Sequence, residues 1–272
     1  MVRRLWTAAT GMLAQQINLD TIANNLSNVN TQGYKTQVNE FKSLLYQTIQ
    51  TKTTSANGEQ KPVGAQVGLG VRNSAISTNF RQGIMMESDN ETAFAIDGKG
   101  FFAVRGDDGN IYYTRNGNFL FTLAANGSSM LANSDGFPVI STAGQPIILS
   151  DQYNPSRITV TADGELCYPD EQNLPQPIGI NIGLFQFNNP NGLDRLGDTL
   201  YGETVNSGQP INEAVNNDVQ RSKVISRYLE GSNVQVADEM VNMIVAQRAY
   251  ELNSKAIIAS DEMLQQANNL KR

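Results

Sequence analysis

Apolar residues near the start of the chain recur every seven positions, and further apolar residues stand three positions after several of them. The repeat is formed by Leu5, Met12, Leu19 and Leu26. Gaps of three and four residues keep one apolar stripe facing a partner, as in the seam of a coiled-coil helix. The pattern predicts one helix over residues 3–29, with Gly33 as its C-terminal cap.

The far end of the chain has a similar pattern. A repeat of seven runs through Val236, Met243, Tyr250, Ile257 and Leu264. It predicts a helix over residues 234–270, with Ser232 or Asn233 as its N-cap. A second apolar stripe lies on another face and contains Val234, Val241, Val245, Leu252, Ala259 and Met263. One partner helix covers only one stripe, so we expect neighbouring molecules to cover the other.

Between the two helices the apolar residues alternate, which is the period of a β-strand. Short strands are expected over residues 101–104, 111–114, 119–121, 147–149 and 157–161. Asx-Gly pairs, which supply the backbone angles of tight hairpins, end in Gly98, Gly109, Gly117, Gly127, Gly136 and Gly164. Their spacing favours a sandwich or barrel. The fold class is therefore mixed α+β, a mainly-β central domain with long N- and C-terminal helices that form a coiled-coil-like module.

These patterns divide the chain into three parts. Residues 1–35 and 225–272 form a helical polymerisation module, residues 36–75 an extended insertion segment, and residues 76–224 a β-rich outer domain. Within the insertion, residues 51–62 are polar and flexible by composition. They fit an ordinary disordered loop and an extension that orders only in an assembly equally well.

Composition excludes several classes of function. The chain has no histidine and a single cysteine, which removes imidazole bases, imidazole metal ligands and internal disulfides. The formal net charge of −6 is concentrated in residues 51–221, which argues against nucleic acid and anionic membranes as partners. No segment approaches the roughly 18 apolar residues of a transmembrane helix, and no apolar run follows Met1 as in a cleavable signal peptide.

The few motifs that resemble chemical sites have simpler interpretations. Gly68-Leu-Gly70 lacks the third glycine of a dinucleotide fingerprint, and the acidic run at residues 107–110 lacks the spacing of a calcium loop. The acids at residues 163–171 are expected in turns, and aromatic residues such as Tyr112, Tyr113, Phe119 and Phe121 in the core, although a glycosidase pair or a ligand groove is the alternative. We therefore expect no catalytic residue, no metal site and no cofactor.

Three longer motifs span residues 23–35, residues 96–119 and residues 232–264. The first and the last resemble the terminal motifs of the bacterial flagellar basal-body rod protein family and of the similar hook and hook-associated proteins, and residues 96–119 resemble the middle domain of this family. The motif positions singled out are Asn24, Asn25, Asn28, Gly33, Gln247, Arg248, Tyr250 and Asn253. Residues 41–49 and 67–71 bring the chain closest to the distal rod members. Residues 122–130 depart from the acidic hairpin that is usual in the family.

The resemblance implies a structural subunit of the distal rod that is not an enzyme. Such a subunit is made in the cytoplasm and passes through the flagellar type III export apparatus without a cleaved signal. It polymerises helically with itself, and the rigid shaft transmits torque from the periplasm to the outer membrane. The implied partners are proximal rod subunits, hook subunits, and the rings in the peptidoglycan and outer-membrane layers. The segment around residues 50–70 would stiffen the rod.

Three other interpretations stay open at this stage. A proximal rod homologue of similar length would have the same class of function. A secreted β-domain adhesin or binding module would explain the β core but not the repeats of seven at both ends. A cell-wall glycan hydrolase would need a cleft with paired carboxylates.

Overall fold

The computed structural model describes residues 2–50, 64–123, 127–150, 152–154, 157–170, 172, 174–216 and 219–269. The chain divides into two compact units. Unit 1 contains residues 1–27, 37–78 and 235–272, and unit 2 contains residues 28–36 and 79–234. The predicted mixed α+β fold with a helix toward each end is confirmed.

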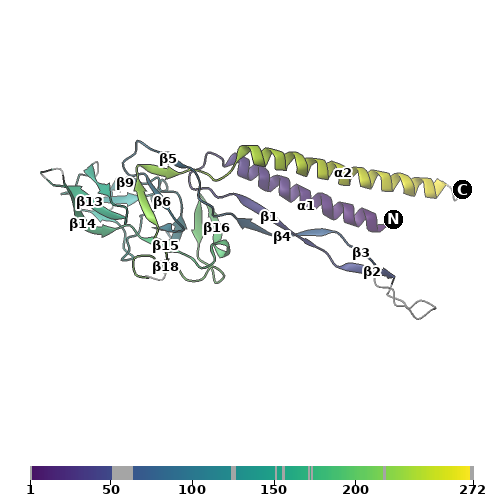
Figure 1. Cartoon of the computed structure of the whole chain (residues 1–272), viewed down its shortest axis with the longest axis horizontal. Helices are drawn as coiled ribbons and strands as arrows, with labels where there is room; N and C mark the ends of the chain where they lie inside the picture. Colours follow the sequence, from purple (N-terminus) through teal and green to yellow (C-terminus); the bar gives the residue numbers. More distant parts are fainter. Residues whose placement is uncertain are drawn as a thin grey trace. The chain divides into compact units, whose positions relative to one another are not determined.

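Unit 1 is built on two long helices, α1 (Val2–Ser27) and α2 (Val236–Asn269). They lie side by side and run in opposite directions, so that both chain termini are at the same end of the pair (Figure 1). Both bounds agree with the sequence prediction to within two residues. Neither helix has the length and apolar character that would let it cross a membrane, among the residues described.

The predicted caps of both helices are wrong. Gly33 lies six residues beyond the end of α1, in a later turn with φ of +70°. The side chain of Asn233 binds Thr36 and not the first turn of α2, which begins at Val236. The chain leaves α1 six residues before Gly33, and Asn233 stands three residues before the first residue of α2, so both residues form other contacts, which are described below.

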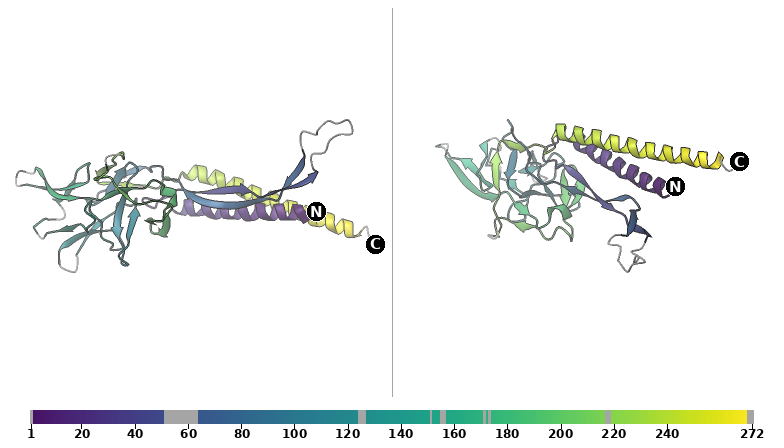
Figure 2. Two further views of the ribbon diagram at one scale, coloured as in Figure 1. Left: turned by 90° about the horizontal axis from the view of Figure 1, so that it is seen from below. Right: turned by 45° about the vertical axis from the view of Figure 1, so that its right-hand side comes forward.

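The rest of unit 1 is a long antiparallel ribbon that runs beside α1 (Figure 2). β1 (Gln37–Ser43) pairs with β4 (Val71–Thr78), and farther along β2 (Tyr46–Gln50) pairs with β3 (Ala65–Gly68). The segment between β2 and β3, for which the sequence left two alternatives open, lies outside the described residues.

Unit 2 contains the remaining strands. Its largest sheet has six strands in the order β16-β17-β8-β7-β15-β18 among the described residues. These are β7 (Phe101–Arg105), β8 (Ile111–Thr114), β15 (Leu184–Gln186), β16 (Asp194–Gly197), β17 (Leu200–Gly202) and β18 (Ile211–Asn212), with a 3₁₀ turn η2 (Pro190–Gly192) before β16. The strand predictions over residues 101–104 and 111–114 are confirmed as neighbouring strands β7 and β8.

Smaller sheets complete unit 2. Two have three strands and consist of β9 (Leu120–Leu123), β10 (Ser129–Ala132) and β11 (Ile148–Leu149), and of β12 (Thr159–Val160), β13 (Glu165–Pro169) and β14 (Pro175–Asn181). Two pairs consist of β6 (Phe94–Asp97) with β19 (Lys223–Ser226), and of β5 (Met85–Glu87) with β20 (Tyr228–Glu230).

Strand β7 is buried on both faces, which explains its nearly continuous apolar sequence. Phe102 and Val104 point into one hydrophobic cluster, and Phe101 and Ala103 point into a second. In the second cluster Phe101 meets Tyr201 edge to face, with ring centroids 6.0 Å apart. One strand thus connects both halves of the core.

Most of the predicted Asx-Gly turns have the backbone geometry that the sequence suggested. Positive φ angles are found at Gly98, Gly109, Gly127, Gly136 and Gly164. Gly117 is different: its carbonyl accepts the Phe94 N–H at 2.9 Å, and a side chain there would collide with the Phe94 carbonyl. At this position glycine is needed for close approach of two backbones and not for a turn.

Alkaline pH is expected to destabilise unit 2 through Tyr201. Burial raises the pKa of this phenol to about 12, against about 10 for a free tyrosine. Between these values the folded state keeps a proton that the unfolded state loses. The contribution of protonated Tyr201 to the stability of unit 2 is therefore complete below pH ~10 and is lost as pH rises through ~12. The slope is about 1.4 kcal/mol per pH unit. Urea unfolding, followed by the circular dichroism of the tyrosines, measures the free energy of unfolding. Above pH ~10 this free energy should fall less steeply with pH in Tyr201→Phe than in the wild type. Tyr46→Phe, in unit 1, is the control, and an equal slope in the wild type and Tyr201→Phe would contradict the assignment.

Candidate functional site

The buried residues of the two long helices are mostly small or polar. On α2 the fully buried residues are Glu239, Ala246 and Ser260. On α1 they are Ala8, Ala14, Thr21, Ile22 and Asn25. Gly11 lies so close to Asn253 that a β-carbon there would stand 2.9 Å from the Asn253 amide nitrogen. Close packing of this kind occupies only a narrow stripe of each helix.

One end of the helix pair is held by a buried amide. The Asn25 Nδ2 donates to the Gln37 carbonyl at 2.9 Å, and Asn25 Oδ1 accepts the Gln37 N–H at 2.9 Å. The same amide lies 3.4 Å from Glu239 Oε2 on α2. Asn25 therefore connects α1, the start of the ribbon and the first turn of α2.

The predicted seams are only partly covered in a single molecule. On α1, the residues Leu5, Met12, Leu19 and Leu26 are half-buried. On α2, Met243 and Ile257 are half-buried, whereas Val236, Tyr250 and Leu264 are exposed by 37–42%. The buried stripe of α2 is centred on small and polar residues, which heptad reasoning assigns to the surface.

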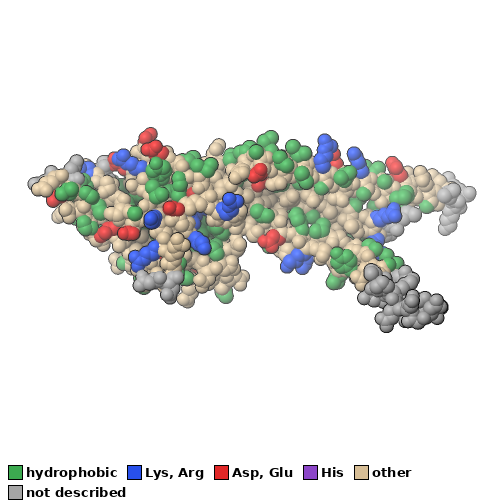
Figure 3. All heavy atoms as spheres, viewed as in Figure 1, with side chains coloured by type: hydrophobic (Ala, Val, Ile, Leu, Met, Phe, Trp, Pro, Cys, Tyr) green, Lys and Arg blue, Asp and Glu red, His purple; other side chains and the backbone are tan. Residues whose placement is uncertain are grey.

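Large apolar side chains are consequently left on the surface of unit 1. The outer face of α2 is defined here as Met240, Val241, Ile244, Val245, Leu252, Ile258 and Met263, which are exposed by 37–66%. Trp6 and Leu13 on α1 are exposed by 67% and 62%. Figure 3 shows hydrophobic side chains at the surface along α2. Contiguous exposed apolar surface of this kind marks an interaction site.

The other motif residues have separate roles. Asn28 Oδ1 accepts a hydrogen bond from the Thr31 hydroxyl at 3.0 Å, in the turn after α1. Arg248 forms an exposed ion pair with Glu251 at 2.9 Å. Gln247 and Asn24 are exposed on their helices. Surface positions of this kind contribute little to the stability of one molecule.

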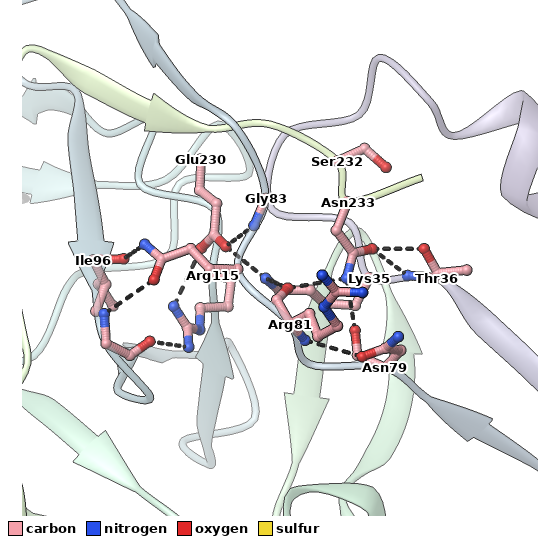
Figure 4. A network of polar contacts seen from close by, with 12 residues as sticks. Lys35, Thr36, Asn79, Arg81, Gly83, Ile96, Arg115, Glu230, Ser232 and Asn233 are labelled. Atoms are coloured by element: carbon pink, nitrogen blue, oxygen red, sulfur yellow. Dashed lines mark hydrogen bonds and ion pairs between the residues drawn. The ribbon is translucent and has the colours of Figure 1, made fainter. Parts of the chain in front are cut away.

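Unit 2 contains a buried cluster of three charged groups that the sequence analysis missed (Figure 4). Glu230 Oε1 accepts from Lys35 Nζ at 2.5 Å and from the Gly83 N–H at 2.9 Å, and Glu230 Oε2 accepts from Arg115 Nη1 at 3.2 Å. The exposed fractions of the three side chains are 0–2%. We call Lys35, Arg115 and Glu230 the ionic cluster.

The ionic cluster joins the two segments that connect unit 2 to the long helices. Gly33 N–H donates to the Glu230 carbonyl at 2.8 Å, and a side chain on Gly33 would collide with the backbone of Asn116. Beside it, Asn233 Oδ1 accepts from both the N–H and the hydroxyl of Thr36, each at 2.7 Å. Asn233 Nδ2 donates to the carbonyls of Asn79 and Arg81. The chain segments after α1, before β5 and before α2 are thus bound to one another.

Burial governs the electrostatics of the cluster. Loss of solvent lowers the pKa of Lys35 below its ordinary value, against the opposing attraction of Glu230, and Arg115 lowers it further. Burial likewise lowers the pKa of Arg115, whose guanidinium also lies 5.2 Å from the ring centre of Phe101. One carboxylate faces two cations, so the cluster depends on Glu230 more than on either base.

The residues weighed as chemical candidates lie in structural positions. Asp108 is in the β7–β8 turn, where it accepts hydrogen bonds from Asn110 and Tyr112 at 2.6 Å each. Tyr113 and Phe119 are core residues with exposures of 1% and 0%. Gly68 ends β3 of the ribbon, and Asp163 lies in the turn before β13.

Comparisons with known proteins agree with the placement of the motifs. The family profile "Flagella basal body rod protein" matches residues 5–35, "Flagellar hook protein FlgE/F/G D1 domain" matches residues 95–168, and "Flagellar basal body rod FlgEFG protein C-terminal" matches residues 225–270.

Full-length relatives extend the similarity over the whole chain. The chain is 43% identical over 274 residues to the flagellar basal-body rod protein FlgG of Borreliella burgdorferi, with 100% of both chains covered. It is 35% identical over 272 residues to FlgG of Bacillus subtilis, again with 100% of both covered. It is 29% identical to the flagellar hook-basal body complex protein FlhP of Bacillus subtilis over 277 residues.

Proposed function

The chain belongs to the flagellar basal-body rod protein family as a structural subunit of the distal rod, and on this premise we propose that it polymerises helically through α1 and α2. The observation that carries the proposal is the outer face of α2, where large apolar side chains remain exposed after α1 and α2 have paired. Burial of such surface contributes about 25 cal/mol per Å². We therefore infer that neighbouring subunits cover the outer face of α2.

The ionic cluster fixes, within unit 2, the two chain segments that lead to the long helices. The segments that leave α1 and enter α2 are held in unit 2 by Glu230, which is buried, and by Asn233, which is half-buried, and both side chains are hydrogen-bonded. A hydrogen-bonded buried network resists deformation more than an exposed loop does.

Further parts of the proposal rest on the family resemblance. The helices act as a coiled-coil-like module, and unit 2 as a sandwich- or barrel-like outer domain. The subunit passes through the type III export apparatus without a cleaved signal peptide. It then joins proximal rod subunits at one end and hook subunits at the other, inside the rings of the peptidoglycan and outer-membrane layers. The ribbon of residues 37–78 stiffens the rod by filling space between subunits.

Purified protein is expected to form straight tubular polymers above a critical concentration, because association covers the outer face of α2 at each contact. Sedimentation over a concentration series and negative-stain electron microscopy measure this directly. A chain that stays monomeric at every concentration, with both helices rigid by NMR, would contradict the proposal.

A further inference from the structure

Unit 1 contains an open groove of about 1080 Å³ between the ribbon and the helix pair, which we call the ribbon groove. Its walls come from the first two turns of α1, the far half of α2, and strands β2 and β3. The lining residues used below are Arg3, Arg4, Ile49, Val67, Ala256 and Met263. We propose that this groove receives the C-terminal part of α2 from a second copy of this chain, with Asp261 and Glu262 of that copy opposite Arg3 and Arg4. The inference rests on the proposed function, because it names one contact by which the subunits polymerise.

The walls of the groove suit a helix. Ile49, Val67 and Met263 are exposed by 60%, 38% and 37%, so they offer apolar surface to an occupant. The lining also includes small residues, among them Gly68 and Ala256. Small residues allow a helix backbone to approach closely, and apolar rims then pack on its side chains.

The charge of the groove selects an acidic occupant. Arg3 and Arg4 line one end, and the first turn of α1 contains no acidic residue. Neither arginine forms an ion pair within the described part of the chain. Two adjacent cations repel each other, and both are repelled by the positive end of the helix dipole. Binding of carboxylates beside them offsets this repulsion.

The C-terminal part of α2 has the complementary pattern. Ile258 is exposed by 55%, and Asp261 and Glu262 follow it by three and four residues, which places all three toward one side of the helix. Both acids are exposed. The three other acids of α2 are less suited. Asp238 lies in the first turn, at the opposite end of the helix, Glu239 is buried against Asn25, and Glu251 already pairs with Arg248.

A charge-exchange experiment on the purified full-length protein tests this contact. The variant with Arg3→Glu and Arg4→Glu, and the variant with Asp261→Lys and Glu262→Lys, are each expected to raise the critical concentration at least tenfold, because like charges meet in the groove. The chain with all four substitutions should polymerise as the wild type does. An equimolar mixture of the two double variants should also polymerise, since each groove then meets a tail of opposite charge.

Each outcome decides something different. Polymerisation of both double variants at the wild-type concentration overturns the groove contact and leaves the proposed function intact, whereas failure of the wild type to polymerise overturns the function itself. Rescue in the fourfold variant without rescue in the mixture would place the pairing inside one molecule and overturn the second copy as occupant. The matched control exchanges Lys42→Glu and Arg72→Glu, a facing pair of exposed basic residues on the ribbon outside the groove. Restoration of polymerisation when this exchange is combined with Asp261→Lys and Glu262→Lys would show that overall charge, and not the groove, is responsible.

Discussion

Replacing Glu230 with glutamine is expected to lower the free energy of unfolding of unit 2 by about 3–5 kcal/mol. The substitution preserves the shape of the side chain but leaves Lys35 and Arg115 as buried cations without a counter-ion. The amide NH₂ group of the new side chain would also face one of the two cations, which is itself a hydrogen-bond donor. Urea unfolding followed by near-ultraviolet circular dichroism of the tyrosines, most of which lie in unit 2, measures the loss. Fluorescence of Trp6, the single tryptophan, follows unit 1 separately.

Two further variants test whether the loss of stability in Glu230→Gln comes from the buried, uncompensated cations. Glu91→Gln removes a carboxylate from an ion pair with Arg227 whose side chains are 40% and 63% exposed, and we expect a change below about 1 kcal/mol. Adding Lys35→Met to Glu230→Gln should recover part of the stability, because one uncompensated cation is replaced by an apolar group of similar length. A loss for Glu230→Gln no larger than for Glu91→Gln would show that the ionic cluster is not a determinant of the fold.

The ionic cluster illustrates what sequence reasoning cannot reach. Lys35, Arg115 and Glu230 are far apart along the chain, and each alone reads as an ordinary surface charge. The one signal was that each stands inside or beside a segment already singled out as a motif. Which charges are buried together depends on the pairing of distant segments, such as β5 with β20, and periodicity contains no information about it.

The helices, unlike the ionic cluster, could be predicted from the sequence. A repeat of seven over several turns is strong enough to predict both helices to within two residues. The buried face of α2 was harder, because the residues that touch α1 include Glu239, Ala246 and Ser260. Glu239 is buried because the Asn25 amide lies beside it, a pairing that only the antiparallel arrangement of α1 and α2 creates. The apolar pattern of α2 thus did not identify the face of the helix that is buried within the molecule.

Leu252→Asp is expected to prevent polymerisation while leaving the single molecule folded. The Leu252 side chain is 66% exposed in the outer face of α2, so the substitution should change the stability of one chain little. In an assembly it removes the burial of a leucine, about 1.5–3 kcal/mol, and places an unpaired carboxylate against apolar surface, which costs more. Since each 1.4 kcal/mol corresponds to a factor of ten, the critical concentration should rise by more than about a hundredfold. Sedimentation gives the critical concentration, and far-ultraviolet circular dichroism checks that the helices remain.

The choice of position decides how much this experiment can show. Leu19→Asp or Ile257→Asp, which the repeat of seven suggests first, would change half-buried residues and could disrupt the α1–α2 pair itself. Leu196→Asp in β16 is the matched control, because it makes the same chemical change at a position 53% exposed in unit 2, and it should polymerise near the wild-type concentration. Equal polymerisation by Leu252→Asp and Leu196→Asp would mean that the outer face of α2 stays exposed in the rod. The drive for assembly would then have to come from the ribbon, from unit 2, or from the exposed apolar side chains of α1, such as Trp6 and Leu13.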